Sequence, residues 1–219
     1  MRNRCCPQPR PIERHHLSIN RIELRSFMSP KRVLAFAASN SLTSINAKLA
    51  NCAARLLQTE FDDGIQVETI HLADYDMPVY SPQREAEGIP TAAKDIYGRI
   101  GAADGLIISF AEYNGCYTAA FKNVFDWSSR IRMQIYQNKP MLMMATSIGS
   151  RGGQNVLKIA SEAAPFFGGK VTSTFNFGPF AEHFDDETQS LKTPELSAEL
   201  KQAVAALYEG LSTPATEFN

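Results

Sequence analysis

The segment SFAEYNGCYTAAFKNVFDW, residues 109–127, brings an acid, an amide, two tyrosines and a glycine together directly after an apolar run. Glu112 and Asn114 can hydrogen-bond a ligand, and Tyr113 offers a flat aromatic face with a polar tip. Gly115 permits a backbone close to a ligand, although an ordinary turn would also explain Asn114 and Gly115. Because loops after buried strands hold the ligands of open α/β sheets, we interpret this segment as one wall of a ligand site.

A second polar segment, ASNSLTSIN at residues 38–46, separates an apolar run from a helical pattern. The free N–H groups and the dipole at a helix start favour a phosphate, and serine hydroxyls add donors. Capping the helix needs only one side chain, Thr43 or Ser44, so we interpret the set as a phosphate site. Its candidate ligands are Ser39, Ser41, Ser44 and Asn46. The segment lacks G-x-G-x-x-G and G-x-x-x-x-G-K-[ST], which disfavours a dinucleotide fingerprint or a P-loop.

A third segment, TSIGSRGGQN at residues 146–155, is rich in glycine and follows the next apolar run. Ser147 and Gly149 are candidate ligand contacts and Arg151 could bind an anion, whereas the alternative is a flexible connection between a strand and a helix. Cys116 in the central segment has no neighbouring histidine to activate its thiol. We therefore expect Cys116 to be a packing residue and assign no catalytic acid, base or nucleophile.

The elements that position these segments alternate between strand and helix along the chain. Short apolar or alternating runs predict strands at residues 33–38, 65–72, 104–110, 140–146 and 170–174. Helical periodicity predicts helices at residues 47–58, 91–100, 117–130, 152–167 and 194–211. Residues 73–90 are expected to form a long loop with three prolines. Strict alternation predicts a flavodoxin-like three-layer sandwich, with a five-stranded parallel sheet of order 2-1-3-4-5 and helices on both faces. All three polar segments then meet at the carboxyl edge of that sheet.

Residues 31–171 resemble the NAD(P)H-dependent FMN reductase family, whose flavodoxin-like members include quinone, azo-dye and chromate reductases. Three spaced motifs carry the resemblance, and the residues that match them are Ser39, Ser44, Asn46, Glu112, Tyr113, Asn114, Gly115, Lys122, Asn123, Asp126, Trp127, Ser147, Gly149, Gly152 and Gly153. Ser41 stands where the family has a phosphate-binding arginine, and losing a bidentate arginine should weaken phosphate binding. Ala38, Ala111, Cys116 and Thr118 also depart from the family pattern.

The resemblance implies an FMN-dependent oxidoreductase that passes a hydride from NADPH or NADH through FMN to a quinone, flavin or similar small acceptor. It implies that the central and third segments border the flavin ring, and that the protein is a homodimer or homotetramer. Lys122, Asp126 and Trp127 are then candidate interface residues, the alternative being a core tryptophan and a surface ion pair. An electron carrier and a flavin-free binding module on the same scaffold stay open as other functions.

Charge and composition set apart a basic N-terminal extension, residues 1–30, and the resemblance implies that residues 31–219 form the FMN-binding reductase domain. Residues 1–32 hold eight Lys and Arg against two Glu, whereas the whole 219-residue chain has a net charge of -1. We expect the extension to be disordered, or to be absent if translation starts at Met28, rather than to be an organelle transit peptide. Four scattered cysteines predict neither disulfides nor a zinc site, which favours a cytoplasmic protein, and we expect His183, Asp185 and Asp186 to form a polar surface loop rather than a metal site. The net charge near zero predicts no membrane or nucleic-acid partner.

Overall fold

Five segments of the chain form one parallel sheet in the computed structural model, which describes residues 29–62 and 64–212. The strands are β1 (Arg32–Ala38), β2 (Gln66–Ile70), β3 (Gly105–Phe110), β4 (Pro140–Thr146) and β5 (Lys170–Phe177). Their order is β2-β1-β3-β4-β5 and every pairing is parallel, so the predicted flavodoxin-like sheet is confirmed. The expected N-terminal extension lies almost entirely outside the described residues, as do residues 213–219.

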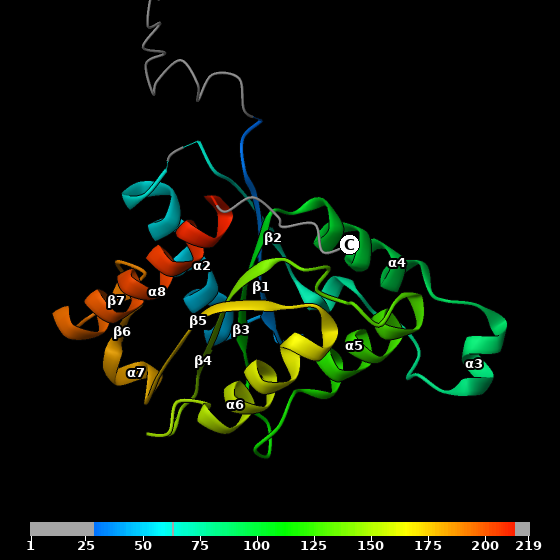
Figure 1. The fold of residues 1–219 in the computed structure, drawn as a ribbon. Helices are drawn as coiled ribbons and strands as arrows, with labels where there is room; N and C mark the ends of the chain where they lie inside the picture. Colours follow the sequence, from blue (N-terminus) through cyan, green and yellow to red (C-terminus); the bar gives the residue numbers. More distant parts are fainter. Residues whose placement is uncertain (1–28, 63, 213–219) are drawn as a thin grey trace, which may run out of the picture.

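Helices cover both faces of this sheet, because a right-handed crossover places its helix on the face set by the direction in which the chain moves along the sheet, and this direction reverses after β2. The long helices are α2 (Ile45–Glu60), α4 (Thr91–Ala102), α5 (Ala119–Ile131), α6 (Gln154–Ala163) and α8 (Pro194–Ser212). Helices α2 and α8 lie on one side, and α4, α5 and α6 lie on the other (Figure 1). None of the helices in the described part of the chain is both long and apolar enough to cross a bilayer.

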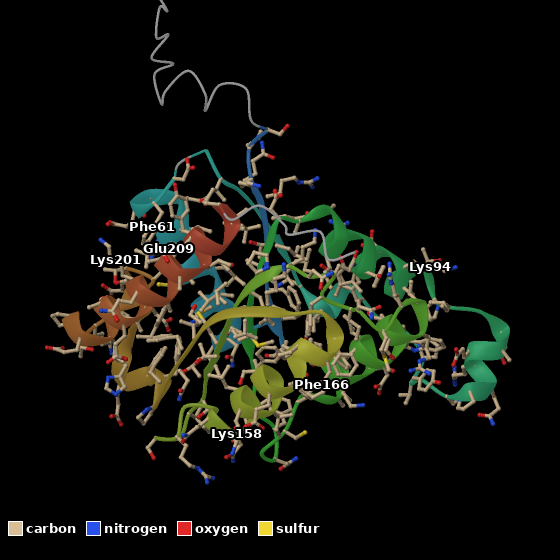
Figure 2. All side chains as sticks on the ribbon, viewed as in Figure 1. Phe61, Lys94, Lys158, Phe166, Lys201 and Glu209 are labelled. Atoms are coloured by element: carbon tan, nitrogen blue, oxygen red, sulfur yellow. The ribbon has the colours of Figure 1, made fainter. Side chains whose placement is uncertain are left out.

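Two apolar cores result, one on each face of the sheet, because successive strand residues point to opposite faces. In β1, Leu34 and Phe36 belong to the core under α4, α5 and α6, whereas Val33 and Ala35 belong to the core under α2 and α8. Charged side chains such as Lys94, Lys158 and Lys201 project outward from the helices (Figure 2). The central strands β1, β3 and β4 are therefore buried on both faces, as their continuous apolar runs predict, whereas the edge strands β2 and β5 are only partly buried.

The long proline-containing loop is more ordered than the sequence pattern indicates. It contains the 3₁₀ turn η1 (Leu72–Asp74) and the helix α3 (Pro82–Glu87), which begins where the side chain of Ser81 accepts a hydrogen bond from the backbone N–H of Arg84. Proline at the first helical position suits a helix start, because its missing N–H would have no partner there. The prediction of a long loop at residues 73–90 therefore missed the end of a 3₁₀ turn and one short helix within it.

The region from α6 to β7 also differs from the predicted helices and strands. Helix α6 ends earlier than predicted, and the 3₁₀ turn η2 (Ala164–Phe167) follows it. Strand β5 continues to Phe177, and residues beyond it form a short helix α7 (Phe180–His183) and a small antiparallel sheet of β6 (Phe184–Asp185) and β7 (Ser190–Leu191). These two-residue strands have no periodicity that a sequence pattern could show.

The α7–β6–β7 unit is attached to α2 and to the loop after β4. The Lys48 ammonium lies 2.6 Å from an Asp186 carboxylate oxygen, and the Arg55 guanidinium donates to the Gln189 carbonyl. The Phe180 N–H donates to the Ser147 carbonyl at 2.9 Å. The unit therefore fixes the start of the third polar segment against the rest of the domain.

Candidate functional site

The three polar segments of the sequence lie at one edge of the sheet, because each follows the carboxyl end of a parallel strand. Strands β1 and β3 are neighbours, yet α2 and α5, which follow them, lie on opposite faces. The chain therefore diverges between these two strands, and such a divergence leaves a crevice outside their carboxyl ends. The topology places the segments after β1, β3 and β4 around this crevice.

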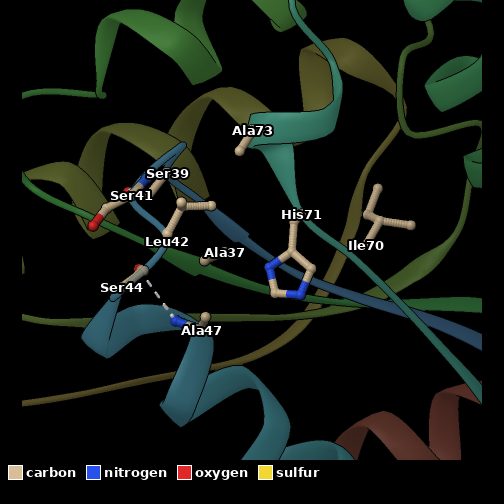
Figure 3. A pocket seen from close by; sticks show the side chains of 9 residues that line it. All are labelled: Ala37, Ser39, Ser41, Leu42, Ser44, Ala47, Ile70, His71 and Ala73. Carbon is tan, nitrogen blue, oxygen red and sulfur yellow. Dashed lines mark hydrogen bonds between the residues drawn. The ribbon is translucent and has the colours of Figure 1, made fainter.

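The first segment forms a small hollow at the start of α2 (Figure 3). The Ser44 side chain caps α2 by accepting a hydrogen bond from the Ala47 N–H at 3.3 Å. The buried Ser39 hydroxyl accepts from the Ser41 N–H at 3.2 Å, which curls the loop over the helix start. The first turn of α2 contains no acidic residue of its own, which leaves the positive end of its dipole without a charge from the helix itself.

Asn46 lies beside these serines in the sequence but has a different environment. Asn46 is only 2% exposed, and the nitrogen of its side-chain amide donates to the Thr146 carbonyl at 3.0 Å. Its amide oxygen accepts from the Thr146 N–H at 3.0 Å and from the Ser109 hydroxyl at 2.8 Å. The structure therefore places this predicted phosphate ligand between α2, β3 and β4, with its amide bonded to the protein.

The second segment forms a tight two-residue turn. Tyr113 and Cys116 exchange both backbone hydrogen bonds, at 3.0 and 3.1 Å, and enclose Asn114 and Gly115. Both enclosed residues have positive φ angles, 53° and 76°, which is the combination that asparagine and glycine favour in a type I′ turn. The interpretation of this dipeptide as a turn is thus correct, and the turn displays Tyr113, which is 52% exposed. Cys116 is exposed as well, so the packing role expected for it was wrong.

Glu112 connects the second segment to the third. Its carboxylate accepts a hydrogen bond from the Val156 N–H at 2.9 Å, in the first turn of α6. A carboxylate at this position stabilises the helix by satisfying an unpaired donor and by its attraction to the helix dipole. The N-terminus of α6 is therefore already occupied by an anion from the protein itself, whereas that of α2 is not.

The two tyrosines of the second segment have different roles. Tyr117 packs among aromatic rings, with ring centroids 5.9 Å from Phe110 and 5.2 Å from Phe121. Burial raises the pKa of the Tyr117 hydroxyl to about 12, so it stays neutral at physiological pH. Thr118 then caps α5 and donates its hydroxyl hydrogen to the Ala38 carbonyl at 3.0 Å. Tyr117 and Thr118 therefore anchor the loop, whereas Tyr113 is exposed at its tip.

The third segment turns sharply over β4 and β5. The Ser147 hydroxyl and Gly149 form a local turn, in which the Gly149 N–H donates to that hydroxyl at 3.3 Å. A Cβ atom on Gly152 would lie 2.4 Å from the Phe177 carbonyl carbon, so protein packing requires this glycine. A Cβ atom on Gly149 would meet nothing closer than the Ser147 hydroxyl at 4.0 Å. Of these two glycines, only Gly149 is left with room beside it for a ligand.

The tryptophan of the family motif lies in the core rather than on the surface. Trp127 is fully buried, and its indole N–H donates to the Pro78 carbonyl at 2.7 Å. Asn123 accepts from the Tyr80 N–H at 2.9 Å and donates to the Met77 carbonyl at 3.1 Å. These two residues hold the loop before α3, and Trp127 is not exposed for an interface.

The charged residues considered for an interface or a metal site lie in a helix surface pair and in the α7–β6–β7 unit. Lys122 and Asp126 form an ion pair at 2.7 Å within one turn of α5, as the surface-pair alternative proposes. His183 ends α7 and Asp185 lies in β6. Among residues 29–62 and 64–212, no group of His, Cys, Asp or Glu side chains is arranged to hold a metal ion.

Several polar residues beneath the site were not predicted from the sequence. Ser109 and Thr146 are buried at the carboxyl ends of β3 and β4, and both contact Asn46. His71 lines the hollow at the first segment and comes from the end of β2 (Figure 3). A single hydroxyl in an otherwise apolar strand, as in GLIISF, is the signal that could have pointed to Ser109.

Comparison with known proteins supports the resemblance of the motifs. A quinone reductase of Escherichia coli is 35% identical over 79 residues, which are 36% of this chain and 42% of that protein. An NAD(P)H-dependent FMN reductase of Pseudomonas aeruginosa is 35% identical over 85 residues, which are 38% of this chain and 46% of that protein. The chain thus spans less than half of the length of these curated relatives.

Solved structures show the same fold at lower identity. FerB, an NAD(P)H:acceptor oxidoreductase from Paracoccus denitrificans, is 22% identical with a TM-score of 0.64, covering 83% of this chain and 97% of FerB. An FMN-dependent NADH-azoreductase from Bacillus anthracis, solved with FMN, is 13% identical with a TM-score of 0.58, covering 81% of this chain and 99% of its own. The profile of NADPH-dependent FMN reductases matches residues 31–182, most of the chain. The chain therefore belongs to the NADPH-dependent FMN reductase family.

Proposed function

We propose that the protein is an FMN-dependent oxidoreductase that uses NADPH or NADH to reduce a quinone, a flavin or a similar small acceptor. The observation that carries this proposal is that two helices starting at the same edge of the sheet have different hydrogen-bond partners at their N-termini. The Val156 N–H in the first turn of α6 donates to the Glu112 carboxylate, whereas the Ala47 N–H in the first turn of α2 donates to the neutral hydroxyl of Ser44, one of three serines that precede this helix. One anion site therefore stays available for a single phosphate group, as FMN requires.

The residues of the first segment suit a phosphate group. Ser39, Ser41 and Ser44 would hold it, together with the backbone N–H groups at the start of α2. Serine hydroxyls can rotate to donate to phosphate oxygens without the charge of the arginine that the family usually has at position 41. Phosphate binding by this chain would thus depend on hydroxyl and backbone donors.

The second and third segments would border the flavin ring. Tyr113 displays an exposed aromatic face on a turn whose shape is set by Asn114 and Gly115. Glu112, fixed to α6, closes the gap between this turn and the third segment. On the far side the contacts would come from Ser147 and Gly149, where the chain leaves room for a flat group. Rigid loops of this kind orient a cofactor and exclude water from one of its faces.

Bound FMN would supply the redox chemistry by accepting a hydride from the nicotinamide and passing reducing equivalents to the acceptor. Because helices pack on both faces of the sheet, a ligand would approach the three segments from the carboxyl edge. Donor and acceptor would therefore use the same opening in turn. We further propose a cytoplasmic homodimer or homotetramer, which the family resemblance supports.

The test is to purify the protein, denature it and chromatograph any released chromophore, and then to titrate the holoprotein with NADPH or NADH without oxygen. We expect FMN, and bleaching of its visible absorbance by at least one nicotinamide. A flavin that stays oxidised would favour the electron carrier, and a protein that cannot take up FMN would favour the binding module. Parallel double-reciprocal lines for nicotinamide and quinone would support a shared opening.

The position of the phosphate can be tested with Ser41→Arg. Restoring a planar, charged donor should tighten FMN binding by about tenfold, because a hydrogen bond to a charged group contributes about 1.5–3 kcal/mol. Ser161→Arg, on α6 and outside the proposed site, is the control for an added positive charge. FMN titration of both flavin-free variants measures the effect. Equal tightening in the two variants would contradict the assignment of the phosphate to the first segment.

A further inference from the structure

Buried polar side chains gather beneath the proposed flavin site. Apart from Ser128 in α5, those of the described residues lie at the carboxyl end of the sheet, at the ends of strands or the starts of helices. They are Ser39, Ser44, Asn46, Ser109, Thr118 and Thr146. Buried polar groups are costly unless they are paired, so such a layer persists only when its hydrogen bonds define one arrangement.

Asn46 connects two other members of this layer, Thr146 and Ser109. Its amide pairs with both the N–H and the carbonyl of Thr146, each at 3.0 Å, and also accepts from Ser109. The Thr146 hydroxyl continues the chain by donating to the Phe177 carbonyl at 2.8 Å. A single side chain in the first turn of α2 is thereby connected to β3, β4 and β5.

This pairing has a direct consequence for the third segment. Thr146 is the last residue of β4 and precedes Ser147, so the amide of Asn46 holds the point at which the segment leaves the sheet. The backbone groups of Thr146 are buried, and without Asn46 they would lose their partners. The strand end could then satisfy them only by moving toward water or toward another donor.

We propose that Asn46 is a positioning residue of the flavin site, which sets the distance between the phosphate segment and the third segment without contacting the cofactor. The proposal rests on the site assignments of the proposed function. It differs from a ligand role because the amide is engaged with Thr146 and Ser109 in the protein. Asn46 would thus act on the flavin only through the placement of residues 147–149.

The test compares Asn46→Ala with Leu57→Ala, a change at a fully buried position near the other end of the same helix. Amide hydrogen exchange of residues 147–153 is measured first, in the flavin-free proteins. FMN affinity and the visible circular dichroism of bound FMN are measured next. We expect Asn46→Ala to accelerate exchange at residues 147–153 and to weaken FMN binding, each by about tenfold, and to change the dichroism. Leu57→Ala should lower overall stability without these local effects.

Unchanged exchange at residues 147–153 in Asn46→Ala, or equal acceleration in Leu57→Ala, would overturn the proposal. If Asn46→Ala does not fold, Ser109→Ala provides a milder change that removes one of the three hydrogen bonds, and it should show the same effects at smaller size. A wild-type protein that binds no FMN would instead overturn the proposed function. Hydrogen exchange in the flavin-free protein tests whether Asn46 positions residues 147–153, and this test does not depend on FMN binding.

Discussion

Two glycines of the third segment have different roles, because the fold requires Gly152 whereas Gly149 is proposed to border the flavin. Gly152 has a φ angle of +59°, and a Cβ atom there would lie 2.4 Å and 2.5 Å from the Phe177 carbonyl carbon and oxygen. Both are backbone atoms, which cannot turn away as a flexible side chain would. Gly149 does not share the positive φ, and its nearest new contact would be at 4.0 Å. We therefore expect Gly152→Ala and Gly149→Ala to have different effects.

The size of the difference follows from these contacts. A left-handed conformation costs an alanine roughly 1–2 kcal/mol, and overpacking against fixed atoms costs about 1–3 kcal/mol more. Gly152→Ala should therefore lower the free energy of unfolding by about 3 kcal/mol. For a domain of this size, 1 kcal/mol shifts the melting temperature by about 2–4 °C, so the expected fall is about 10 °C.

Denaturant and thermal unfolding of the flavin-free proteins measure the stabilities, and FMN titration follows. Gly149→Ala should keep the stability of the wild type but weaken FMN binding, because its new methyl group points into space that the ring is proposed to border. A Gly152→Ala protein as stable as the wild type would refute the packing argument. Unchanged FMN affinity in Gly149→Ala would remove that residue from the site.

Other changes test single interactions elsewhere in the domain. Ser128→Ala should leave stability unchanged or raise it by up to about 1 kcal/mol, because the buried hydroxyl has no hydrogen-bond partner among the described residues; a clear loss in the denaturant midpoint would contradict this. The free energy of unfolding of Asn114→Ala should be about 1 kcal/mol lower than that of Asn114→Gly, because the φ angle of 53° suits glycine. Asn114→Ala should therefore melt at a lower temperature. The hydrogen bond from Arg99 holds the pKa of Asp95 below its ordinary value of 3.8. This stabilisation is complete above pH 3.8 and is lost as the pH falls through the lower, folded-state pKa, so acid should reduce the stability advantage of the wild type over Asp95→Asn. An advantage independent of pH would contradict the pairing.

The sequence alone determined the architecture and the segments that form the site. Continuous apolar runs such as GLIISF predict strands buried on both faces, and their alternation with helical patterns leaves few topologies. Polar residues after β1, β3 and β4 then had to meet, since parallel strands end at the same edge. Asn114 and Gly115 determined their own turn, because few residues accept positive φ angles. These are local or periodic properties, which a sequence records directly.

Only the tertiary structure decided what each polar residue contacts. Asn46 and Ser44 are two positions apart, yet one braces β3 and β4 while the other caps α2. Glu112 bonds to the N–H of a residue 44 positions later in the chain, and Gly152 is required by the backbone of Phe177. Such partners are distant in the chain and adjacent in space. Hydrogen bonds and steric contacts act over a few ångströms, so only the packed fold defines them.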